Sequence, residues 1–324
     1  MVGGWSGGTT HLPCHFTAAS RNVATMALTG TQFTISAGDY EATVVEVGAG
    51  LRRFTRGGVD ITAPYATDEL PPRCDGAVLM PWPNRLRNGE YVFEGQKLQV
   101  PVTERPQNNA NHGLARWSRW APIAQEQDSI TLACKIVPQT GWPFEISAAV
   151  TYSVDVEAGL TVTSSVFNEG TGRAPFGAGF HPYLSLHGHS LDEVVLQIPA
   201  NSRIITDEAQ VPVGQAEVDD SEYDFRGARA LKSQRLDDAF GELNYVDGRG
   251  AVLLSTPSGS TQIWYDESFR FLQVFTAEEL AHFSPAVAVE PMTCPADAFN
   301  SGTGLIVLEP GADWTGTWGV TPIG

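Results

Sequence analysis

Two stretches of the sequence end a row of very small side chains with a group that can transfer protons. In PFGAGFH, residues 175–181, alternation along a strand places His181 on the same face as two glycines. In AVAVE, residues 286–290, Glu290 shares its face with two alanines. Small side chains leave open volume above a sheet, where a sugar ring could fit. A carboxylate and an imidazole beside it are suitable acid/base partners near neutral pH.

Each group has a plainer alternative, a satisfied core histidine or a Glu–Arg ion pair. The repetition of the pattern with complementary groups favours a site. Pro182 and Pro291 follow the two groups directly. Because proline limits the continuation of a strand, we expect His181 and Glu290 to lie at strand ends.

A second histidine lies in NNANHG, residues 108–113. The Asn and Gly content predicts a loop or turn, where binding groups commonly sit on a rigid scaffold. His112 is therefore a candidate site residue, and the alternative is an exposed loop histidine.

The segment PWPNR, residues 81–85, supplies three candidate substrate-binding residues, Trp82, Asn84 and Arg85. Two prolines stiffen it, and the Arg85 guanidinium offers several donors in a fixed fork for sugar hydroxyls. Trp82 could form an apolar wall against a sugar face. The alternatives are a structural salt bridge for Arg85 and core packing for Trp82.

An aspartate pair, Asp237 and Asp238, is a weaker signal. A carboxylate accepts hydrogen bonds from sugar hydroxyls, but adjacent aspartates more often cap a turn or face solvent.

The elements that must position these groups are strands. Alternation of apolar and polar residues, with a period of two, dominates from about residue 31. It predicts an antiparallel hairpin over residues 150–166. Further strands are expected over 41–47, 129–137, 194–198, 251–255, 262–265, 271–276, 305–308 and 314–320. Helical periodicity is scarce, and neither a strand–helix rhythm nor a repeat of fixed period is visible. We therefore expect one large antiparallel β domain over residues 26–324, preceded by a disordered extension, residues 1–25.

Composition excludes several classes of function. The 20 Lys and Arg against 37 Asp and Glu give a net charge of −17, which disfavours nucleic acid and membrane surfaces as partners and favours a neutral substrate. The four cysteines are widely spaced, and no apolar leader is visible, so we expect free thiols in the cytoplasm. Motifs for a nucleophilic serine, a phosphate loop, a dinucleotide or a bound metal are missing, so no metal or other cofactor is expected.

Taken in order, these residues resemble the aldose 1-epimerase (galactose mutarotase) family. The resemblance spans roughly residues 30 to 320, and its landmarks are PWPNRLRNGEYVFEG at 81–95, NHGLARW at 111–117, FGAGFHPYL at 176–184, LDDAF at 236–240, VAVEPMTCPADAFN at 287–300 and LEPG at 308–311. It implies a single large antiparallel β-sandwich, the galactose mutarotase-like supersandwich, with an open sugar-binding cleft.

The resemblance also implies roles for individual residues. Glu290 matches the family's general base, His181 its general acid, and His112 a second histidine near the ring oxygen. Arg85 and Asp237 match groups that hold sugar hydroxyls. Asp237 is preferred to Asp238 because the family pattern resembles D-x-x-F.

The expected function is the interconversion of the α and β anomers of a free aldohexose such as glucose or galactose. Ionised Glu290 would take the proton of the anomeric hydroxyl while protonated His181 protonates the ring oxygen, and rotation about C1–C2 followed by reclosure would give the other anomer. No cofactor is needed, and we expect a monomer or weak homodimer.

Three alternatives remain open. A hexose-6-phosphate or modified-hexose 1-epimerase would use the same machinery with a basic pocket, to which Arg85, Arg87, Arg116 and Arg119 could contribute. A non-catalytic carbohydrate-binding module would use tryptophans as stacking platforms. A glycoside hydrolase would need two suitably separated carboxylates, of which only Glu290 is well placed.

Overall fold

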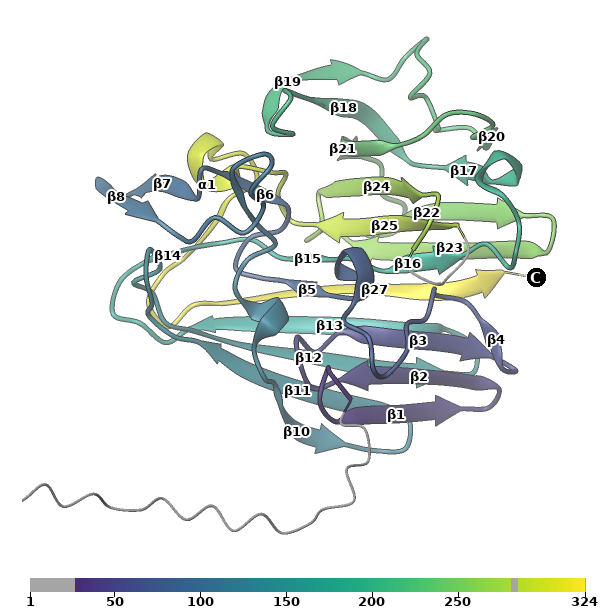
Figure 1. Ribbon diagram of the computed structural model, residues 1–324, viewed down its shortest axis with the longest axis horizontal. Helices are drawn as coiled ribbons and strands as arrows, with labels where there is room; N and C mark the ends of the chain where they lie inside the picture. The colour runs from purple at the N-terminus through teal and green to yellow at the C-terminus, as the bar shows by residue number, and fades with distance from the viewer. Residues whose placement is uncertain (1–26, 281–284, 324) are drawn as a thin grey trace, which may run out of the picture.

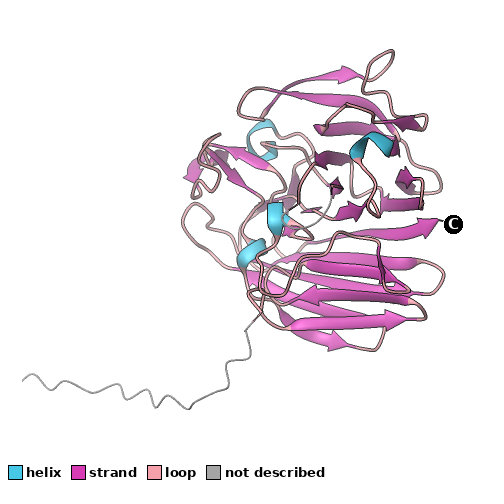
Figure 2. Ribbon diagram, turned by 45° about the vertical axis from the view of Figure 1, so that its right-hand side comes forward, coloured by secondary structure: helices cyan, strands magenta, loops and turns pink. Residues whose placement is uncertain are grey.

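The computed structural model describes residues 27–280 and 285–323. The predicted N-terminal extension, residues 1–25, lies outside the described residues. Strands make up most of this part of the chain, and its single α-helix, α1, is the short segment Ala298–Ser301 (Figure 2).

The larger of the two main sheets has nine strands within the described residues. In spatial order they are β10 (Ala121–Gln125), β11 (Ser129–Ile136), β12 (Ile146–Asp155), β13 (Gly159–Asn168), β27 (Asp313–Ile323), β23 (Gly259–Asp266), β22 (Arg249–Thr256), β17 (Val195–Gln197) and β20 (Arg229–Ala230). All neighbouring pairs are antiparallel.

The second main sheet has eight strands in the same described part of the chain, and it carries the candidate site. In spatial order they are β19 (Pro212–Glu217), β18 (Ala200–Thr206), β21 (Asp237–Leu243), β24 (Phe271–Ala277), β25 (Ala286–Met292), β15 (Gly179–Phe180) and β5 (Val78–Leu79), with β16 (Tyr183–Ser185) also paired to β25. In Figure 1, β18, β21, β24 and β25 of this sheet lie in the upper part of the view, at the level of β20, β17 and β22 of the larger sheet.

Smaller sheets complete the fold. A four-stranded sheet of β1 (Gln32–Ala37), β2 (Tyr40–Val45), β3 (Leu51–Arg56) and β4 (Val59–Asp60) packs against β12, as Figure 1 shows. The remaining pairs are β6 (Arg85–Arg87) with β9 (Asn109–Asn111), β7 (Glu90–Phe93) with β8 (Gln96–Gln99), and β14 (Ala174–Phe176) with β26 (Ile306–Leu308).

Large aromatic side chains hold the two main sheets together. The Phe180 ring on β15 lies 5.2 Å from the Trp318 ring on β27, measured between centroids, and both side chains are almost completely buried. Phe180 also contacts Phe269, at the start of the segment leading to β24. Since each aromatic side chain buries a large apolar area, these contacts make a continuous core between the layers. The predicted antiparallel sandwich is confirmed.

Alternation predicted the strands well because one face of each sheet is buried. The predicted hairpin is β12–β13, and all eight further strands are present with ends shifted by a few residues. At the hairpin turn the backbone N–H groups of Glu157 and Ala158 donate to the Asp155 carboxylate at 2.8 and 2.9 Å. Gly159 then takes a φ of +77°, a conformation that glycine adopts without strain.

Three of the four cysteines, Cys74, Cys134 and Cys294, lie in the described residues and are free thiols there, as predicted. Cys14 lies outside that part of the chain. Over the same described ranges, no helix has the length and apolar character that crossing a membrane requires.

Candidate active site

An open cavity of about 330 Å³ lies on the eight-stranded sheet, where the predicted chemical groups converge. Its lining is dominated by polar and ionisable side chains. The lining residues are Arg73, Cys74, Asn84, Arg85, Gln107, Asn111, His112, His181, Tyr183, Gln210, Asp237, Gln273, Phe275 and Glu290.

Strand register brings His181 and Glu290 face to face. Along β25, Met292 pairs with Gly179 of β15, and Ala288 pairs with Tyr183 of β16. His181 lies midway between these two pairs, and therefore opposite Glu290. Its Nε2 is 3.3 Å from Glu290 Oε1, and the two side chains are 8% and 2% exposed.

The backbone on the other side of His181 fixes its position. The His181 N–H donates to the Ala77 carbonyl at 3.1 Å, and the His181 carbonyl accepts from the Gly76 N–H at 2.9 Å. The imidazole is stacked on the Tyr183 ring with centroids 5.1 Å apart. These contacts anchor the imidazole while its Nε2 faces the carboxyl group.

Two expectations about the segments that carry His181 and Glu290 were wrong. A Cβ on Gly177 would come within 2.5 Å of the Cys294 sulfur, and one on Gly179 within 2.8 Å of the Pro83 side chain. Neighbouring side chains therefore fill the space that we expected to be open. The strand end predicted at Pro291 is also displaced, because β25 continues to Met292. The cavity instead opens over the polar side chains beyond the glycine row.

Burial controls the protonation of the central pair. The loss of hydration raises the pKa of Glu290 well above its ordinary value, and the nearby Asp237 carboxylate raises it further, against the opposing charge of Arg85. Burial lowers the pKa of His181 to about 3, with smaller effects from Arg116 and Arg85. The pair therefore favours a protonated carboxyl beside a neutral imidazole. This reverses the expected ionisation, because neither charge retains its hydration shell.

His112 is brought to the same cavity and is buried rather than exposed on a loop. Its ring lies edge-on to the His181 ring, with centroids 5.4 Å apart. Burial lowers the pKa of His112 well below its ordinary value, and the neighbouring His181 lowers it further. Its Nδ1 accepts the Asn84 N–H at 3.3 Å. The proton of the neutral ring is therefore on Nε2, which makes that atom a donor.

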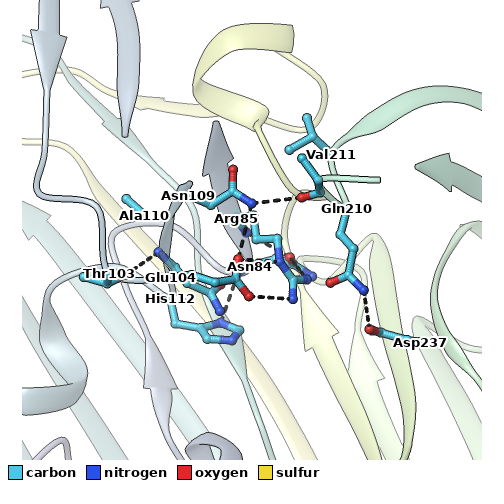
Figure 3. Close-up of polar contacts among 12 residues, drawn as sticks. Asn84, Arg85, Thr103, Glu104, Asn109, Ala110, His112, Gln210, Val211 and Asp237 are labelled. Carbon is cyan, nitrogen blue, oxygen red and sulfur yellow. Dashed lines mark hydrogen bonds and ion pairs between the residues drawn. The ribbon is translucent and has the colours of Figure 1, made fainter. Parts of the chain in front are cut away.

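Asn84 and Arg85 form a connected polar wall with Glu104 (Figure 3). The Arg85 guanidinium makes two 2.9 Å hydrogen bonds to Glu104, and its Nη1 also donates to Asn84 Oδ1 at 3.3 Å. The Asn84 amide donates to Gln273 Oε1 at 3.2 Å. Arg85 thus has the salt bridge of the plainer alternative and still lines the cavity.

Asp237, and not Asp238, lines the cavity. The Asp237 carboxylate accepts hydrogen bonds from the amides of Gln273 at 2.7 Å and Gln210 at 2.9 Å, the latter drawn in Figure 3. Asp238 points to the opposite face of β21 and pairs with Arg203 at 2.6 Å. Strand alternation separates the two adjacent carboxylates.

Trp82 is not at the site. Its side chain is 4% exposed within the core, its ring contacts Phe299 edge-on at 5.6 Å, and its indole N–H donates to the Ala110 carbonyl at 3.4 Å. The expected wall against a sugar face is therefore wrong for Trp82, because the segment turns this side chain inward. The aromatic side chains that line the cavity are Tyr183 and Phe275.

Gln273 was missed, although its position is central. It lies on β24 directly opposite Glu290, and it links Asn84 to Asp237. A signal was available, since Gln273 interrupts the apolar run FLQVFT. Three further lining residues were also missed, Gln107, Asn111 and Gln210. They lie in turns or on a short paired strand, whose positions only the tertiary structure reveals.

Several buried polar atoms of the lining have no hydrogen-bond partner among the described residues. They are His181 Nδ1, Glu290 Oε2, Asn111 Oδ1 and Gln210 Oε1. Unpartnered polar groups are costly in a buried site, and their concentration here makes the cavity suitable for a polar ligand. Within residues 27–280 and 285–323, no group of three or more His, Cys, Asp or Glu side chains is arranged to hold a metal ion.

Comparison with known proteins is consistent with this geometry. Residues 31–321 match the family model of aldose 1-epimerase. The chain is 36% identical to the uncharacterized protein YihR of Escherichia coli (strain K12) over 289 residues, which cover 89% of this chain and 92% of YihR.

Two solved structures show the same fold. The GalM/aldose epimerase homologue from C. elegans superimposes with a TM-score of 0.79 at 18% identity, covering 90% of this chain and 98% of the other. Galactose 1-epimerase from Lactobacillus acidophilus NCFM gives a TM-score of 0.75 at 19% identity, with 90% and 94% covered.

Proposed function

The chain belongs to the aldose 1-epimerase family, and from this premise we propose that it interconverts the α and β anomers of an aldohexose with a free anomeric hydroxyl. The observation that carries the proposal is the 3.3 Å contact between His181 Nε2 and Glu290 Oε1 at a polar cavity. Ring opening of a hemiacetal requires one proton to leave the anomeric hydroxyl and another to reach the ring oxygen. A paired acid and base can perform both transfers.

The reaction begins with one proton shared by the buried pair. Transfer of this proton from Glu290 to His181 gives a carboxylate and an imidazolium, which the hydroxyls of a bound sugar stabilise. Glu290 then accepts the proton of the anomeric hydroxyl, and His181 donates its proton to the ring oxygen. The C1–O5 bond breaks to give the aldehyde, and rotation about C1–C2 exchanges the two faces of the carbonyl. Reversal of both transfers closes the other anomer.

The surrounding groups have supporting roles in this proposal. His112, with its proton on Nε2, donates a hydrogen bond near the ring oxygen, where negative charge develops as the ring opens. Asp237 accepts hydrogen bonds from sugar hydroxyls, while Arg85 and Asn84 donate to them or accept from them. Glu104 and Gln273 fix the orientation of these side chains through the hydrogen bonds described above.

The experiment that tests the proposal is polarimetry on freshly dissolved α-glucose and α-galactose. We expect the protein to accelerate the approach to the equilibrium rotation without changing the equilibrium value. Sugar binding without acceleration would support a non-catalytic binding module and contradict the proposal. Release of a reducing sugar from a glycoside would instead support a hydrolase.

Replacing Asp237 by asparagine is expected to raise KM about 10- to 100-fold with a smaller effect on kcat. A charge-assisted hydrogen bond of about 1.5–3 kcal/mol is lost in both the bound sugar and the transition state. Steady-state polarimetry over a range of sugar concentrations measures both constants. Asp238→Asn is the matched control, and it should lower thermal stability through its Arg203 pair while leaving KM unchanged. Equal KM values for the wild type and Asp237→Asn would remove Asp237 from substrate binding.

The pH profile of kcat/KM should be broad. The active form of the Glu290–His181 pair holds one shared proton. Activity therefore falls at low pH, where the imidazole beside the protonated carboxyl takes up a second proton, and at high pH, where the pair loses the shared one. Burial lowers the pKa of His181 to about 3 and raises that of Glu290, which moves the two limbs apart.

We therefore expect kcat/KM at pH 5 and pH 7.5 to agree within about threefold, after subtraction of the buffer rate. A histidine with an ordinary pKa of about 6.5, acting as the acid, would lose activity about tenfold by pH 7.5. A decline of that size would contradict the coupled, buried pair.

A further inference from the structure

One cavity-lining arginine has no carboxylate partner. Arg73 lies in the short 3₁₀ turn Pro72–Cys74, with a φ of +47°, and its side chain is exposed. Its guanidinium carbon lies 5.6 Å from the centroid of Phe275, another lining residue, and among the described residues it forms no ion pair. Arg73 therefore presents an uncompensated positive charge at the cavity.

A second positive charge contacts the residue that follows Arg73 in the chain. The Arg116 guanidinium donates to the sulfur of Cys74, which also lines the cavity, at 2.7 Å. Within the described part of the chain, Arg116 also forms no ion pair with a carboxylate. By contrast, Glu104 compensates the Arg85 charge with two hydrogen bonds. The Arg73 side of the cavity is thus positively charged, and the Asp237 side is not.

This local charge contrasts with the composition of the protein. With 37 acidic and 20 basic residues, carboxylates are abundant as partners for arginine, and eight of the fifteen other arginines in the described chain are ion-paired, among them the lining residue Arg85. An arginine that lacks such a partner and lines a cavity is available to bind an anion from solution. A planar guanidinium suits the oxygen atoms of a carboxylate, phosphate or sulfonate.

We propose that the substrate is an aldohexose bearing an acidic substituent, and that Arg73 binds the acidic group while the anomeric centre lies at His181 and Glu290. This inference rests on the proposed function and specifies its substrate. It also departs from the neutral substrate that the net charge favours, because the charge next to the ligand outweighs the total. The Phe275 ring faces the Arg73 guanidinium in a cation–π contact, which favours its position at the cavity.

Anomerisation rates for glucose, glucose 6-phosphate, glucuronate and 6-deoxy-6-sulfoglucose test the inference and identify the acidic group. We expect at least one acidic sugar to exceed glucose in kcat/KM by about tenfold or more. Arg73→Gln should lower that acidic-over-neutral ratio by about 10- to 100-fold, the loss of one charge-assisted contact. Arg73→Lys should lower it less, since it retains the charge but not the fork. Inorganic phosphate and sulfate serve as competitors that distinguish a bound sugar acid from a general anion site.

Arg56→Gln is the matched control. Arg56 is also exposed, lies over an aromatic ring, that of Tyr40, at 5.4 Å, and forms no ion pair in the described residues, but it is not a lining residue of the cavity. Its replacement should leave the ratio unchanged. Glucose equal to or better than every acidic sugar, or an unchanged ratio in Arg73→Gln, would overturn the inference.

The inference and the proposed function fail in different ways. If no sugar is anomerised, the proposed function fails, and calorimetric binding of glucose 6-phosphate and glucuronate to the wild type and Arg73→Gln still tests the anion site. The anion site is supported if the wild type binds these acids more strongly than glucose and Arg73→Gln loses that binding. Equal binding by both proteins would contradict it.

Discussion

Replacing Glu290 by glutamine should slow anomerisation by about 10²- to 10⁴-fold, the contribution typical of one positioned proton-transfer group. Glutamine has nearly the same shape as a protonated glutamate but cannot take up or release the proton that the reaction moves. Because burial raises the pKa of Glu290 and favours its neutral form, this substitution changes little in the folded protein without sugar. Thermal stability should therefore stay within about 3 °C of the wild type, a shift that corresponds to about 2 kcal/mol for a chain of this length.

Glu157→Gln provides the matched control for this variant. Glu157 is exposed in the β12–β13 turn and is not one of the residues that line the cavity. Its replacement should leave both the rate and the stability unchanged. A Glu290→Gln variant that anomerises sugar at the wild-type rate would show that Glu290 does not transfer the proton.

Replacing His181 by glutamine is the second change with a large expected effect, again about 10²- to 10⁴-fold on kcat/KM. The glutamine amide can occupy the position of Nε2, but it cannot deliver a proton to the ring oxygen. Loss of the stacking on Tyr183 should also lower the melting temperature modestly. Polarimetry gives the rate, and His189→Gln is the control, because His189 bonds Glu193 and Ser258 outside the cavity.

The two groups should behave as one unit. Since one proton is shared across the contact between them, removal of either group disables the exchange. The double variant Glu290→Gln/His181→Gln is therefore expected to retain a rate within about threefold of the slower single variant. Multiplication of the two separate losses would show that the residues act independently.

The strands and the location of the central pair were predictable because both follow from local alternation. Glu290 lies on β25, and His181 lies between β15 and β16, which both pair with β25 and so bring the two residues together. The choice of Asp237 over Asp238 came from the family pattern, and the structure separates the two by the same alternation.

Other features depend on long-range packing that a single sequence does not reveal. Pro83 and Cys294 fill the space beside Gly177 and Gly179, although these residues are far from the glycines in sequence. The inward turn of Trp82 depends on Phe299, more than two hundred residues away. The reversed protonation of the pair depends on burial of both groups, which the residue types alone do not specify. Arg73 stands out only when the cavity lining is known, because of the two lining arginines it is the one without a carboxylate partner in the described residues.

Exchange between the two anomers at equilibrium tests the central claim most directly. Saturation transfer in the proton NMR spectrum, from the anomeric hydrogen of one form to that of the other, measures interconversion without product removal or coupled enzymes. We predict strong transfer with the wild type for glucose or an acidic hexose, and transfer reduced to the buffer level with Glu290→Gln and with His181→Gln. Sugar that binds to the wild type without any transfer above the buffer level would contradict the account.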